Sequence, residues 1–158
     1  MSYSIVKIDE DGNYVSQVVN KNPALKEAVK GITTLYKIDE GLNPMVMTNI
    51  LELKYLDYLG VGFDFNTCCK CGKKSNIVTI DPDVGGYICK NCYTNEIIYD
   101  SKTLKMLRMY YLVDIKSISK LKISDNIIKN INYFVNTYYD RYTGLYLKSK
   151  KFLNELIE

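Results

Sequence analysis

The sequence contains no histidine and no tryptophan among its 158 residues. Without histidine, a mixed cysteine and histidine metal site is excluded, and so is a histidine general base. Long apolar stretches are missing as well. The longest unbroken run, Met109–Val113, is far shorter than the roughly 20 residues that cross a bilayer. The first seven residues also lack the apolar core of a secretion signal, so we expect a cytoplasmic protein with reduced cysteines.

The most informative feature that is present is a frame of four cysteines. Cys68 and Cys71 form one CxxC pair, and Cys89 and Cys92 form another after 17 intervening residues. This spacing is typical of structural zinc sites, in which four thiolates surround one ion. Because four protein ligands leave no open position for an activated water, the predicted zinc ion is structural and not catalytic. Cys69 is expected to remain a free thiol.

Two other interpretations of the cysteines are weaker. A thioredoxin-like dithiol needs one CxxC pair beside a βαβ pattern, which neither pair has. A disulfide framework needs a secreted chain. Glycines support the metal interpretation, because Gly72 and the pair Gly85 and Gly86 offer the positive φ angles that tight turns near a metal require.

The remaining patterns predict a mainly α protein, a helical bundle into which a small zinc-binding β-hairpin module with four cysteine ligands is inserted. The expected divisions are an uncertain segment over residues 1–22 and a helical domain over 23–158, with the zinc module at 67–93. Helices are predicted over Pro23–Ile38, Pro44–Leu59, from Ser101, from near Asp125 to Gly144, and from Ser149; strands are predicted over Asn76–Ile80 and Gly86–Ile88. Apolar residues recur at helical spacing after Ser101, from Leu104 to Ile115. We interpret the apolar surface of Pro44–Leu59 and the stripe after Asp125, with its aromatic members, as core.

Residues before Asn22 support two alternatives. The alternation in Tyr3–Ile8 and Tyr14–Val19 around Asp11 and Gly12 favours a hairpin, whereas three valines within the second stretch also fit a helix turn.

Charge is unevenly distributed along the chain. The net charge is only +3, but residues 101–158 carry 11 basic and 5 acidic groups. Candidate contacts to DNA or to a protein partner are therefore basic residues of this third, against the simpler interpretation of solvated faces: Lys102, Lys105, Arg108, Lys148, Lys150 and Lys151.

Four stretches together resemble a known family. Leu51–Gly60, Cys68–Gly72, Gly85–Cys92 and Tyr142–Leu153 are similar, in this order, to the C-terminal part of the bacterial recombination mediator RecO. The resemblance implies a non-enzymatic DNA repair and recombination protein with a helical domain and one Zn²⁺. It further implies binding and annealing of single-stranded DNA, and help to RecR in loading RecA through contact with single-stranded-DNA-binding protein.

The resemblance has one clear departure. The family begins with an oligonucleotide-binding β-barrel, and nothing similar precedes Asn22 here, so we expect only weak binding of single-stranded DNA. The acidic, phenylalanine-ended tail of single-stranded-DNA-binding protein is expected near Lys148, Lys150 and Lys151, beside Tyr146 and Phe152.

Two alternative functions fit the sequence less well. A zinc-ribbon interaction module fits the cysteines but not the long helices on both sides of them. An Arf GTPase-activating domain needs an arginine soon after the second cysteine pair, and the first one here is Arg108, within an apolar helix.

Overall fold

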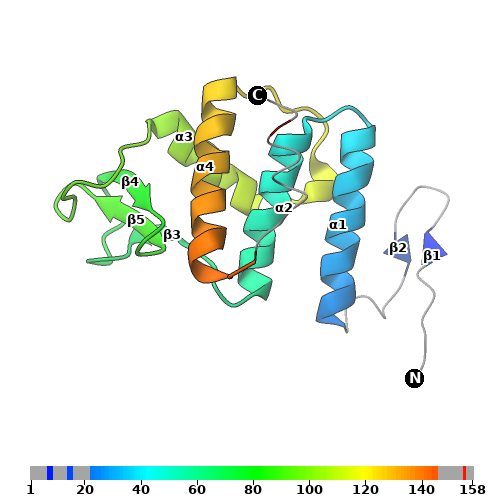
Figure 1. Ribbon diagram of the computed structural model, residues 1–158, viewed down its shortest axis with the longest axis horizontal. Coiled ribbons are helices and arrows are strands. Elements are labelled where there is room, and N and C mark those ends of the chain that lie inside the picture. The colour runs from blue at the N-terminus through cyan, green and yellow to red at the C-terminus, as the bar shows by residue number, and fades with distance from the viewer. Residues whose placement is uncertain (1–6, 9–13, 16–21, 146–154, 156–158) are drawn as a thin grey trace.

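The computed structural model describes residues 7–8, 14–15, 22–145 and 155 (Figure 1). Near the N-terminus, β1 (Lys7–Ile8) pairs antiparallel with β2 (Tyr14–Val15), with Lys7 opposite Val15. This pairing agrees with the hairpin alternative at the four described residues, and the rest of the two stretches lies outside the described residues.

The first two helices begin where the sequence predicts. In α1 (Pro23–Asp39), the side chain of Asn22 accepts a hydrogen bond from the backbone N–H of Ala24 at 3.0 Å. In α2 (Pro44–Tyr58), Asn43 accepts from Val46 at 3.1 Å. Proline follows both caps, because the first helical residue needs no N–H donor. Gly41 and Gly60, with φ of 96° and 75°, follow the two helix ends.

The later helices differ in detail from the prediction. In α3 (Ser101–Leu112) the N-cap is Asp100, one residue before the predicted Ser101, and it accepts from the N–H of Thr103 at 2.8 Å. Ile115, which the helical spacing of apolar residues places in the same helix, lies instead on a separate 3₁₀ turn, η2 (Ile115–Ser117). Helix α4 (Asp125–Tyr142) matches the prediction closely. The predicted last helix from Ser149 falls outside the described residues.

Helix α2 is the centre of the bundle. It packs against α1, α3 and α4, and Figure 1 shows it between α1 and α4. Met47, Ile50, Leu53 and Leu56 of α2 are fully buried. The aromatic stripe of α4 is core, as interpreted from the sequence: Phe134 is 1% exposed. No helix among the described residues has the length and apolar character needed to cross a membrane.

A small sheet lies beyond α4 in Figure 1. It comprises β3 (Asp64–Cys68), β4 (Ile77–Asp81) and β5 (Gly86–Cys89), in the order β3-β5-β4. Strands β4 and β5 form the predicted hairpin, and β3, which was not predicted, pairs parallel with β5.

The sheet is fixed to the helices by side chains from both sides. Phe63 packs against Phe134 and Tyr138 of α4, with ring centroids 5.0 and 4.0 Å away. At the turn between β4 and β5, Arg141 pairs with Asp83, whose carbonyl oxygen also accepts from the hydroxyl of Tyr142. The sheet and the bundle therefore share one core.

Candidate metal centre

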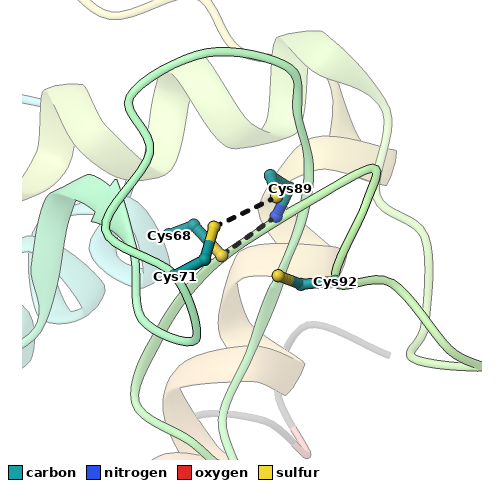
Figure 2. Close-up of side chains that lie close together, drawn as sticks. All are labelled: Cys68, Cys71, Cys89 and Cys92. Atoms are coloured by element: carbon teal, nitrogen blue, oxygen red, sulfur yellow. Dashed lines mark hydrogen bonds between the residues drawn. The ribbon is translucent and has the colours of Figure 1, made fainter.

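The structure brings the four cysteines of the CxxC pairs together. Cys68 and Cys89 are the last residues of β3 and β5, and both are buried. Cys71 and Cys92 lie in the turns that follow these strands and are more exposed. All four Sγ atoms lie within 4.8 Å of one another, and Figure 2 shows them facing a common centre. The Sγ atoms of Cys71 and Cys89 are 3.6 Å apart.

These distances fit a tetrahedral zinc ion. A Zn–S bond of about 2.3 Å places the sulfur atoms of a tetrahedron about 3.8 Å apart. The sulfur–sulfur distances in the cluster exceed this value by at most about 1 Å, and the 3.6 Å between Cys71 and Cys89 is close to it. A donor set of four cysteine thiolates is also the set that closed structural zinc sites use. The chain thus has a zinc-binding cluster whose expected role is to hold the two turns together.

Backbone hydrogen bonds shape each turn around its cysteines. In the first turn, the backbone N–H of Cys68 donates to the carbonyl oxygen of Lys73 at 2.8 Å, and the N–H of Gly72 donates to the carbonyl oxygen of Cys68 at 2.7 Å. Gly72 has a φ of 72°, which glycine adopts without strain. In the second turn, the N–H of Cys92 donates to the carbonyl oxygen of Cys89 at 3.0 Å. The N–H of Cys89 points at the Sγ of Cys68, at 3.4 Å.

Without metal, the cluster shares protons unequally. Burial opposes ionisation of Cys68, but the backbone N–H groups of Cys89, Lys70 and Cys71 outweigh burial and lower the pKa of the Cys68 thiol to about 6. The pKa of Cys89 is lowered in the same way against its own burial. The pKa of Cys92 is raised to about 12, first by its hydrogen bond with Cys71 and then by burial. Zinc must therefore displace protons from the cluster when it binds.

Cys69 stands apart from the cluster. Its N–H donates to the carbonyl of Tyr87 at 2.9 Å, and its side chain packs beside Gly86, where an added Cβ would meet the Cβ of Cys69 at 3.1 Å. Burial, and then the neighbouring Cys68, raises the pKa of the Cys69 thiol. This position agrees with the prediction that Cys69 does not bind the metal.

Lys70 and Glu96 form an ion pair at the cluster that sequence reasoning missed. The Nζ of Lys70 is 2.6 Å from a carboxylate oxygen of Glu96. Lys70, followed by the N–H of Thr94, lowers the pKa of Glu96 to about 2. The position of Lys70 inside the first CxxC pair was the only signal in the sequence for this ion pair. Glu96 could not be identified as the partner, because it lies 26 residues away along the chain.

The candidate basic residues are placed only in part. Lys102 and Lys105 are exposed on α3. Arg108 is exposed on the same helix, and its guanidinium donates to the carbonyl of Phe65 at 3.0 Å and to the side chain of Asn66 at 3.3 Å. Arg108 thereby ties α3 to β3. The three remaining candidates lie outside the described residues: Lys148, Lys150 and Lys151.

Comparison with known proteins connects this architecture to one family. Residues 31–151 match the family described as "Recombination protein O C terminal". The chain belongs to the RecO family. Relatives named DNA repair protein RecO include those of Bacillus cereus (strain AH187) and Bacillus anthracis, each 33% identical over 138 residues. The Bacillus subtilis (strain 168) relative is 28% identical over 153 residues. No solved structure gives a significant match.

The match covers much of this chain but only part of its relatives. It spans 85% of the chain and 55% of the Bacillus cereus protein, and 90% and 59% for Bacillus subtilis. The chain thus spans little more than half the length of these relatives. RecO is a family of recombination and DNA repair proteins, and this chain carries its C-terminal part.

Proposed function

We propose that the chain acts as the C-terminal part of a RecO-type recombination mediator. In this role it binds single-stranded DNA, promotes annealing, and helps RecR load RecA through contact with single-stranded-DNA-binding protein. Zinc held by the four cysteines keeps the sheet folded. The observation that supports this proposal most directly is the family match over residues 31–151, which includes the whole cysteine frame.

The alternative of an independent zinc-ribbon module is less well supported. The sheet shares its core with α3 and α4, since Phe65 packs on Tyr111 at 4.6 Å and Phe63 packs on Phe134. Zinc ribbons are small units that fold around their own metal. Here the metal centre completes a helical domain.

Binding of single-stranded DNA is expected to be weak and strongly dependent on salt. Each phosphate that a lysine neutralises releases counterions and contributes a slope of about −0.7 in a plot of log affinity against log salt. If Lys102 and Lys105 contact phosphates, their joint replacement by glutamate should reduce the slope by about 1.4. Fluorescence anisotropy with a labelled oligonucleotide at several salt concentrations measures this. Tight binding that salt does not change would instead indicate base stacking on exposed tyrosines such as Tyr36 and Tyr133.

For the protein partner, the described residues offer a pocket of about 680 Å³. It lies between α1, the C-terminal ends of α2 and α3, and η2. Four lysines line it: Lys26, Lys30, Lys54 and Lys116. Leu112 and Tyr58, which are 61% and 51% exposed, belong to the same lining. Exposed apolar side chains beside ammonium groups suit a ligand that is both acidic and aromatic.

Lys54 is the central charge of this pocket. Its Nζ donates to the backbone carbonyl of Tyr111 at 2.8 Å, a partner without a full charge. Three carboxylates also line the pocket, and each has a partner. Glu27 pairs with Lys30 at 2.7 Å, Asp57 accepts from the hydroxyl of Tyr111 at 2.6 Å, and Asp114 accepts from the backbone N–H of Lys116 at 3.2 Å. Burial, and then Lys30, lowers the pKa of Lys54. A bound carboxylate would counteract both effects, so the pocket favours the acidic, phenylalanine-ended tail.

We therefore expect that replacing Lys54 by methionine weakens a peptide copy of this tail about tenfold, which corresponds to about 1.4 kcal/mol. Methionine keeps the packing of the stem but removes the charge. Leu112→Asp should have a similar effect by removing part of the apolar wall. Anisotropy of a labelled peptide at moderate salt measures both, with the exposed Lys129 of α4, replaced by glutamate, as the control.

The same titration distinguishes the site predicted from the sequence. If Lys148 and Lys151 hold the tail, their joint replacement by glutamate weakens the peptide tenfold while Lys54→Met leaves it unchanged. Loss of affinity in the Lys54 and Leu112 variants alone supports the pocket. A peptide that binds equally to all variants would contradict both sites.

A further inference from the structure

Lys70 lies between the cysteines of the first turn, yet its ammonium group contacts the second turn. Its Nζ is 2.6 Å from Oε1 of Glu96 and 3.3 Å from the carbonyl oxygen of Cys92. Cys92 is the last of the four metal ligands, and Glu96 follows it four residues later. Lys70 thus joins the two halves of the metal site through protein atoms alone.

Glu96 is a rigid anchor for this contact. Its side chain is only 9% exposed. One carboxylate oxygen accepts from the backbone N–H groups of Thr94 and Asn95, at 2.7 and 3.2 Å, and the other accepts from the Thr94 hydroxyl at 3.1 Å as well as from Lys70. A carboxylate held by this many donors keeps one orientation, and the lysine that pairs with it is held in place as well.

The four metal ligands therefore differ in what positions them. Cys68 and Cys89 end two paired strands, so the sheet fixes their backbone. Cys71 and Cys92 lie beyond the strand ends, where ladder pairing no longer acts. Lys70 and Glu96 connect the two turns that carry Cys71 and Cys92. We infer that the Lys70–Glu96 ion pair is a clasp that positions Cys71 and Cys92 for zinc and slows the loss of the metal.

A simpler electrostatic explanation makes a different prediction. Zinc with four thiolates carries a charge of −2, so any nearby lysine favours the loaded site. Lys90, which lies between the cysteines of the second turn, is exposed and has the same charge. If charge alone matters, Lys90 and Lys70 should contribute equally. If the clasp matters, Lys70 and Glu96 should contribute together and Lys90 little.

The test measures how fast the zinc-loaded full chain transfers zinc to an excess of a chromophoric chelator. Lys70→Met, Glu96→Gln, the double variant and Lys90→Met are compared with the unaltered chain. Loss of a residue that orients metal ligands typically costs about 10- to 100-fold in metal affinity. We expect zinc release to accelerate at least tenfold in either single clasp variant. The double variant should match the single ones, because partners in one contact are not additive. Lys90→Met should stay within about twofold.

Three results would overturn the clasp. They are release from Lys70→Met and Glu96→Gln at the original rate, equal acceleration by Lys90→Met, and effects of the two clasp variants that simply multiply. If Lys70→Met does not fold, Glu96→Gln alone decides, because glutamine retains the acceptor oxygen for Thr94 while weakening the pair. The clasp belongs to the metal centre, so zinc release does not depend on which DNA or protein the chain binds.

Discussion

Replacing Cys89 by serine is expected to abolish zinc binding and to unfold the three-stranded sheet. A structural zinc ion contributes its binding free energy to folding, about 10–16 kcal/mol in zinc-finger peptides. Here the sheet also supplies buried side chains to the shared core, among them Phe65, Ile80 and Tyr87. Loss of the metal should therefore lower the stability of the whole domain by several kcal/mol, measured by thermal unfolding beside metal analysis.

Cys69→Ser provides the matched control for this result. Cys69 neighbours a ligand but lies outside the cluster, so its variant should bind one zinc per chain and unfold at nearly the original temperature. Full zinc occupancy in Cys89→Ser would disprove the assignment of the ligands. A chelator should reproduce the effect of Cys89→Ser on the unaltered chain.

The first two helices were predictable because residues at their own ends specify where they start and stop. An asparagine followed by proline marks the start of α1 and α2, and a glycine follows each end. The ligand set was predictable for a similar reason, since cysteine spacing alone restricts which sulfur atoms meet. The buried surface of α2 follows from where its apolar residues fall, but α1 does not obey this rule: Leu35 and Tyr36 are 67% and 56% exposed, whereas Thr34 is buried.

Strand β3 was not predictable from its own residues. Asp64–Cys68 contains asparagine, aspartate and threonine, and its partner β5 lies beyond β4 in the sequence. Phe63 and Phe65, the residues before and after Asp64 in the sequence, are both buried in the core, and their burial holds this segment beside β5. Tertiary burial here determines the strand, and local propensity does not.

The roles of basic residues were the least predictable feature. Lys102, Lys105 and Arg108 follow helical spacing, but the sequence does not show what faces them. In the structure, Arg108 binds the backbone of β3, while the two lysines are exposed. The sequence likewise does not show the partner of Lys70, because only the fold brings Glu96 beside it.

A second large effect is expected at Phe134 of α4. Its side chain is 1% exposed and packs on Phe63 at 5.0 Å and on Tyr99 at 6.3 Å, where the bundle meets the sheet. Replacing a buried phenylalanine by alanine removes its transfer free energy and leaves a cavity, which costs about 3–5 kcal/mol. Urea unfolding of Phe134→Ala should show a loss of this size, with zinc still bound at low denaturant because the four cysteines are unchanged.

The adjacent residue gives the control for this prediction. Tyr133 precedes Phe134 on the same helix but is 57% exposed, so Tyr133→Ala should change the unfolding free energy by no more than about 0.5 kcal/mol. If the aromatic side chains of α4 instead served mainly to stack bases, Phe134→Ala would weaken DNA binding and leave stability nearly unchanged. A difference of several kcal/mol between two neighbouring aromatic residues is what burial predicts, since only one of them is removed from water.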